Sequence, residues 1–103
     1  MYRNGRSVST RYLTLHWFPR DDDPAGEPRL GIAVPKTVSA SAVVRNTLKR
    51  QLRATWSELG ELARPGLDYV LVARQGVAEP SETRGHEWLA AQVAEALEKV
   101  PAA

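Results

Sequence analysis

Residues 42–53 read Ala-Val-Val-Arg-Asn-Thr-Leu-Lys-Arg-Gln-Leu-Arg, and this segment carries more structural information than any other in the chain. At 100° per residue, its apolar side chains fall on one side of a helix and its polar side chains on the other. The apolar side continues beyond the segment and comprises Val44, Leu48, Leu52, Thr55 and Leu59. The polar side carries Arg45, Asn46, Lys49, Arg50 and Arg53. We therefore predict an amphipathic helix with one face on a core and a cationic face in solvent.

The cationic face contains no acidic residue, which is unusual for a solvated helix. Opposite charges three or four residues apart stabilise a helix, and like charges destabilise it. The bias extends along the chain: residues 1–53 hold ten Lys or Arg and four Asp or Glu, whereas residues 54–103 hold four and eight. This asymmetry is typical of a protein that binds a polyanion. Chance clustering of charge on a solvated surface is the alternative.

The composition excludes several classes of protein. A chain of 103 residues, 43% of them hydrophobic, is expected to form a single domain over its whole length, 1–103. It has no cysteine, so it can form neither a disulfide nor a thiolate metal site. No apolar run is long enough to span a membrane, and the first residues lack the apolar core of a signal peptide. We therefore expect a cytoplasmic protein.

Alternation and turn residues predict the remaining elements. The polar, proline-bounded segment 19–28 is expected to be a loop, and Ser39-Ala-Ser41 offers an N-cap for the helix. The predicted elements are strands at 7–18, 29–34 and 69–73 and helices at about 42–59 and 82–99, with the strand at 69–73 buried on both faces. This order favours an α+β sandwich in which helices pack on one face of a single mixed sheet.

Three segments together resemble the bacterial ribonuclease P protein subunit. They are Arg29-Leu-Gly-Ile-Ala-Val-Pro-Lys36, the helical segment 42–53, and Gly66-Leu-Asp-Tyr-Val-Leu-Val-Ala-Arg74. Gly5-Arg6 and Arg11-Tyr-Leu-Thr-Leu-His16 extend the similarity, which covers roughly residues 2 to 77. The combination of a basic helix with the preceding Gly-Ile-Ala-Val-Pro-Lys strand makes the resemblance specific.

The resemblance implies a function in RNA processing. Members of this family partner a large catalytic RNA that removes the 5′ leader from precursor tRNA. The RNA and its Mg²⁺ ions perform the chemistry, so we expect no catalytic residue and no metal ligand in this chain. The family also implies a monomer in a 1:1 ribonucleoprotein, and a left-handed strand–helix–strand crossover, against the usual right-handed rule.

Position by position, the resemblance assigns two groups of site residues. The RNA-docking residues are Lys36, Arg45, Asn46, Lys49, Arg50 and Arg53. In the cleft for the single-stranded leader, Tyr2 and His16 occupy positions where the family carries aromatic residues, and flat rings suit stacking on unpaired bases. Arg11 is expected either to add positive charge to this cleft or to pair with an acid such as Asp68.

The sequence departs from the family pattern at several places. The family places a further helix before the position of Tyr2, so we expect a mis-assigned start, a shortened fragment or a natural loss of that helix. Thr37 and Thr47 replace a lysine and an arginine. The segment Ser39-Ala-Ser41, which we call the serine connector, is one residue longer than usual. These changes reduce the positive charge, and we expect weaker RNA binding or a stronger requirement for Mg²⁺ and low salt.

Other readings of the sequence lead to different classes of function. His16 and His86 could be paired as acid and base in a stand-alone nuclease, but no motif surrounds either. Asp21-Asp-Asp23 resembles a cation site but lacks converging ligands, so we expect a solvated loop. An RNA-binding module on the same scaffold, without a role in cleavage, remains the alternative to a ribonuclease P subunit.

Overall fold

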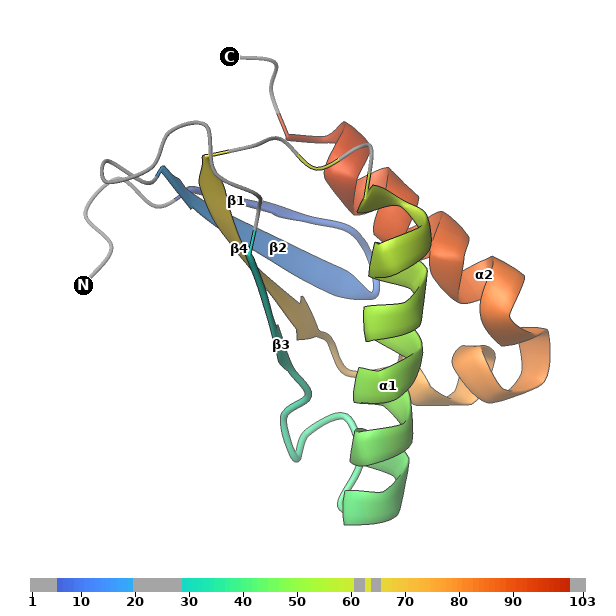
Figure 1. Cartoon of the computed structure of the whole chain (residues 1–103). Coiled ribbons are helices and arrows are strands. Elements are labelled where there is room, and N and C mark those ends of the chain that lie inside the picture. The colour runs from blue at the N-terminus through green and yellow to red at the C-terminus, as the bar shows by residue number, and fades with distance from the viewer. Residues whose placement is uncertain (1–5, 20–28, 61–62, 64–65, 101–103) are drawn as a thin grey trace.

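The computed structural model describes residues 6–19, 29–60, 63 and 66–100 of the chain. Its elements follow the order β1 (Arg6–Ser9), β2 (Leu13–Pro19), β3 (Arg29–Ala33), α1 (Ala42–Glu58), β4 (Leu67–Ala73) and α2 (Ala78–Glu98). The strands form one mixed sheet in the order β1-β2-β4-β3, and both helices lie on the same side of it (Figure 1). The predicted α+β class, with helices on one face of a single sheet, is confirmed.

The sheet combines antiparallel and parallel pairs. β2 pairs antiparallel with β1 and with β4, while β3 pairs parallel with β4. Because α1 lies between β3 and β4 in the chain, the parallel pair is joined by a strand–helix–strand crossover. The crossover brings the start of α1 close to the end of β3, where a short connector joins them (Figure 1).

The single strand predicted at 7–18 is wrong, because a turn that starts at Thr10 divides it into β1 and β2. The Thr10 amide donates to the Leu13 carbonyl at 2.8 Å, and the Thr10 hydroxyl accepts from the amides of Tyr12 and Leu13 at 3.3 and 3.1 Å. A threonine hydroxyl can replace backbone partners in this way, so β-branched composition alone did not distinguish a long strand from a hairpin.

The prediction that the strand at 69–73 is buried on both faces is also wrong. Tyr69, Leu71 and Ala73 are buried against the helices, but Val70 and Val72 on the other face are only half-buried. Within the described residues, the helices cover one face of the sheet (Figure 1). The valines therefore reflect the β-branched preference of strands rather than full burial.

The helix α1 matches its prediction closely. Ser41 is the N-cap, and its hydroxyl accepts from the Val44 amide at 3.3 Å. Leu48, Leu52, Thr55 and Trp56 are buried on the core side. Trp56 also meets Tyr69 of β4 edge-to-face, with ring centroids 5.0 Å apart.

The helix α2 starts earlier than predicted, at Ala78 rather than Glu82, and it is kinked. Gly85 interrupts it with φ 80° and ψ −164°, a conformation that only glycine adopts readily. Beyond the kink, Leu89, Val93 and Leu97 are buried against β2 and α1. No helix in the described part of the chain is both long and apolar enough to cross a membrane.

Candidate nucleic-acid interface

The helix α1 carries five of the six residues that the family resemblance assigned to RNA docking. Asn46, Lys49, Arg50 and Arg53 are exposed, whereas Leu48 and Leu52 on the opposite side are 2% and 0% exposed. From Arg45 to Arg53 the helix advances about 12 Å. We call Arg45, Asn46, Lys49, Arg50 and Arg53 the basic face of α1.

The basic face has no acidic partner. Among the residues that the structure describes, none of its four cations forms an ion pair, and the first turn of α1 contains no acid. Repulsion between neighbouring cations is therefore uncompensated within this part of the molecule. A ligand with regularly spaced negative charges would compensate it, and a nucleic acid backbone has such charges.

Arg45 differs from the other cations of the basic face. It is half-buried, and its Nη1 atom donates to the Ser39 carbonyl oxygen at 2.9 Å. This bond ties the serine connector to the first turn of α1. Lys36 lies in the same loop between β3 and α1 and is exposed. Arg45 thus holds the connector in place as well as adding charge, whereas Lys49, Arg50 and Arg53 are free to engage a ligand.

The residues assigned to the leader cleft do not form one group in the described structure. His16 lies on β2, half-buried on the sheet face that the helices leave open, with Ser7 and Val70 as its strand neighbours. Arg11 lies instead in the β1–β2 turn, with its guanidinium 5.4 Å from the centroid of the Tyr12 ring. Tyr2 lies outside the described residues, as does Asp21-Asp-Asp23.

The expected pairing of Arg11 with Asp68 is not formed. Asp68 lies opposite Phe18, at the other end of β2 from Arg11, and its carboxylate is 3.6 Å from Nε of Arg29. Arg29 and Asp68 line a hollow of about 270 Å³ beside Gly31 and Val70. The contact between Arg29 and Asp68 was not predicted from the sequence, because it depends on the parallel register between β3 and β4, which are far apart in the chain.

The two histidines of the described ranges lie in different surroundings. His86 does not approach His16; its Nε2 atom lies 2.7 Å from a carboxylate oxygen of Glu58, where it links the end of α1 to α2. Within these ranges, no group of three or more His, Asp or Glu side chains could hold a metal ion.

Comparisons with known proteins give a consistent picture. A family model described as Ribonuclease P matches residues 1–100. A ribonuclease P protein component from Geobacillus thermodenitrificans is 40% identical over 79 residues, which is 77% of this chain and 63% of that protein. One from Synechococcus elongatus is 37% identical over 78 residues, with 75% and 64% covered. The chain thus matches somewhat less than two thirds of the length of these relatives.

Solved structures share the fold. The RNase P protein from Thermotoga maritima superposes with a TM-score of 0.82 at 23% identity, covering 97% of this chain and 87% of that one. The Staphylococcus aureus RNase P protein gives a TM-score of 0.74 at 24% identity, with 93% and 81% covered. At this level of identity the structural similarity supports the fold, and the family assignment depends on the sequence matches.

Proposed function

The chain belongs to the ribonuclease P protein family, and we propose that it is the non-catalytic protein subunit of the ribonuclease P endoribonuclease. In this proposal it binds the catalytic RNA subunit and the 5′ leader of precursor tRNA, and so supports maturation of tRNA 5′ ends. It acts as a monomer in a 1:1 ribonucleoprotein in the cytoplasm. The RNA carries the chemistry, and the Mg²⁺ ions belong to the RNA.

The observation that carries this proposal is the unpaired basic face of α1. Arginine suits phosphate binding because its planar guanidinium offers two parallel N–H donors to a pair of oxygens, and Lys49 adds a mobile point charge between Arg45 and Arg53. With Lys36 in the adjoining loop, about five phosphate contacts are available. Such a number predicts a slope on the order of −4 in a plot of log affinity against log salt concentration.

The open face of the sheet is the proposed site of the leader. It presents His16 of β2 with Val70 and Val72 of β4, all half-buried, in a region that the two helices do not cover (Figure 1). An imidazole ring can stack on any base, which allows binding without sequence preference. Tyr2 remains assigned to this cleft by the family pattern. Arg11 lies in the β1–β2 turn, before the start of β2, so we do not include it in this cleft.

Reconstitution with a ribonuclease P catalytic RNA tests the proposal. Cleavage of a precursor tRNA is measured at low Mg²⁺ with and without the chain, and the chain is expected to accelerate leader removal. Lys49→Gln should reduce this acceleration severalfold, because one phosphate contact is lost. Lys99→Gln is the control, since it makes the same change on an exposed lysine that follows α2 and donates to the Ser9 carbonyl at 3.0 Å rather than lying on the basic face of α1.

Two results would contradict the proposal in different ways. If the chain binds the catalytic RNA but does not accelerate leader removal, it is an RNA-binding module on this scaffold without a role in cleavage. If Lys49→Gln and Lys99→Gln behave alike in both binding and cleavage, the basic face of α1 is not the docking surface.

A further inference from the structure

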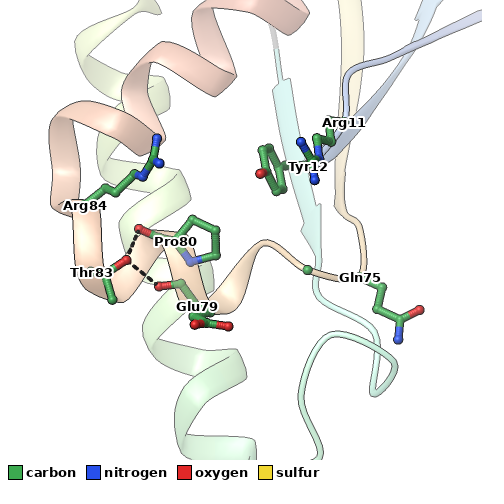
Figure 2. A pocket seen from close by; sticks show the side chains of 8 residues that line it. Arg11, Tyr12, Gln75, Glu79, Pro80, Thr83 and Arg84 are labelled. Atoms are coloured by element: carbon green, nitrogen blue, oxygen red, sulfur yellow. Dashed lines mark hydrogen bonds between the residues drawn. The ribbon is translucent and has the colours of Figure 1, made fainter.

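A hollow of about 500 Å³ opens between the β1–β2 turn and the first segment of α2, which comprises residues 78–84 before the kink at Gly85. Its walls include Arg11, Tyr12, Gln75, Glu79, Thr83 and Arg84. Figure 2 shows Arg84 on one side of the space and Arg11 with Tyr12 on the other, while Glu79 lies at a distance from both groups. Its volume is typical of a small-molecule or single-group binding site.

The hollow collects donors that the rest of the described structure does not use. Within the described residues, neither the Arg11 nor the Arg84 guanidinium forms an ion pair, and the Tyr12 hydroxyl has no hydrogen-bond partner. The Thr83 hydroxyl, in contrast, already donates to the carbonyls of Glu79 and Pro80 (Figure 2). With two cations and one carboxylate, the lining has a net positive charge.

Hydrogen bonds hold in place the β1–β2 turn, which carries Arg11 and Tyr12. The Arg74 Nη1 atom donates to the Thr10 carbonyl at 2.6 Å, and the Arg74 amide donates to the Tyr12 carbonyl at 2.9 Å. Both bonds fasten the β1–β2 turn to the end of β4. The Tyr12 ring meets Trp88 edge-to-face at 4.9 Å, so the second segment of α2 also supports it.

Arg84 is positioned by the kink in α2. It is the last residue before Gly85, whose backbone conformation turns the chain between the two segments of the helix. The first segment thereby stands away from the sheet and forms the far wall of the hollow (Figure 2). The bonds that fasten the β1–β2 turn and the backbone conformation of Gly85 therefore set the distance between the two walls of the hollow.

We propose that this hollow binds a phosphate group. The Arg84 guanidinium on one wall, and the Arg11 guanidinium and Tyr12 phenol on the other, need an acceptor with oxygens in several directions. A tetrahedral phosphate provides these, whereas a planar carboxylate offers two oxygens in one plane. The phosphate comes either from the backbone of a bound RNA or from a free phosphate or nucleotide, and the experiment below distinguishes the two.

This site is separate from the basic face of α1. The first segment of α2 presents Ala78, Ser81 and Glu82 toward α1, where they line a small groove with Val44 and Leu48. It presents Glu79, Pro80 and Thr83 to the hollow on its other side. The RNA-backbone version of the inference rests on the proposed function. It implies that an RNA contacts the protein on both sides of this segment.

Nuclear magnetic resonance of the ¹⁵N-labelled chain tests the site directly. One sample receives inorganic phosphate and another a short single-stranded RNA without terminal phosphates. We expect shifts at the amides of Tyr12, Gln75 and Gly76 in at least one of them. Arg11→Gln and Arg84→Gln should each weaken the response about tenfold, since each removes a charge-assisted pair of hydrogen bonds. Arg6→Gln, an identical change on an exposed arginine at the end of β1 far from the β1–β2 turn, should leave the phosphate response of these amides unchanged.

The outcomes separate this inference from the proposed function. Shifts with RNA assign the site to backbone phosphates, and shifts with inorganic phosphate alone assign it to a free phosphate. If neither ligand moves these amides, or if Arg6→Gln weakens the phosphate response as much as Arg84→Gln, the site does not exist. That result would leave the RNA-binding role of α1 intact. Conversely, a phosphate response that persists while α1 variants bind RNA normally would support the hollow and contradict the proposed docking face.

Discussion

Gly85 shows how one residue can organise two parts of the molecule. Its φ of 80° and ψ of −164° place it in a region that side-chain-bearing residues avoid, and it separates the core-packed segment of α2 from the segment that carries Arg84. A Cβ atom built at Gly85 would meet nothing within 4 Å. The requirement for glycine is therefore conformational and not steric.

Gly85→Ala is expected to lower the free energy of unfolding by about 1–3 kcal/mol, because alanine is strained in this conformation. Urea denaturation followed by circular dichroism measures the change. Gly60→Ala is the control, since a Cβ there also meets nothing within 4 Å and Gly60 has no positive φ. Equal stability of the two variants would show that the kink is not maintained in solution.

Arg45 and Thr10 show what residue patterns can and cannot predict. The helical period placed Arg45 with the polar side chains of α1, but it did not predict that Arg45 is half-buried and bonded to the Ser39 carbonyl, which depends on the path of the connector. The turn at Thr10 was hidden because threonine suits a strand as well as a turn. Its two anchors come from Arg74, sixty-four residues away, which a local pattern does not contain.

At the scale of elements, α1 separates stability from binding. Its buried side holds Leu48 and Leu52 against the sheet and α2, while its exposed side carries cations that the described residues do not pair. The buried leucines and the exposed cations point to opposite sides of the helix. Changes on one side should therefore affect one property and spare the other.

Leu52→Ala is expected to cost about 2–5 kcal/mol of unfolding free energy, since Leu52 is completely buried and its removal leaves a cavity. Val43→Ala should cost little, because Val43 is 75% exposed on the same helix. Denaturation of both variants gives the comparison. Once folded, the Leu52→Ala protein should bind RNA with the same salt dependence as the unchanged chain. A loss of that dependence would mean that binding and packing are coupled through α1.

The elements that the sequence predicted best are those with a strong local signal. For α1, the apolar period and the Ser41 cap agree, and the structure confirms its start and, to within one residue, its end. The division of 7–18 and the early start of α2 were missed. The turn in the first segment depends on the hydroxyl of Thr10, a residue type that also suits strands. In α2, a single glycine at position 85 separates the unpredicted first segment from the predicted one, and one glycine is a weak sequence signal.

For the whole molecule, the class of fold followed from the order of strands and helices, and the family resemblance supplied the crossover between β3 and β4. The proposed binding surfaces differ in how far a local pattern could locate them. The basic face of α1 was identified from its charge pattern, because helical period and charge are both local. The hollow beside Arg84 was not, because the β1–β2 turn and α2 meet only in the folded chain.

The dependence of RNA affinity on salt concentration tests the central claim, that α1 binds RNA phosphates through its exposed cations. The account predicts a log–log slope on the order of −4 for the unchanged chain. Replacing Lys49, Arg50 and Arg53 together with glutamine should reduce its magnitude by about 2 to 3 while the protein remains folded. An unchanged slope in this triple variant would contradict the account.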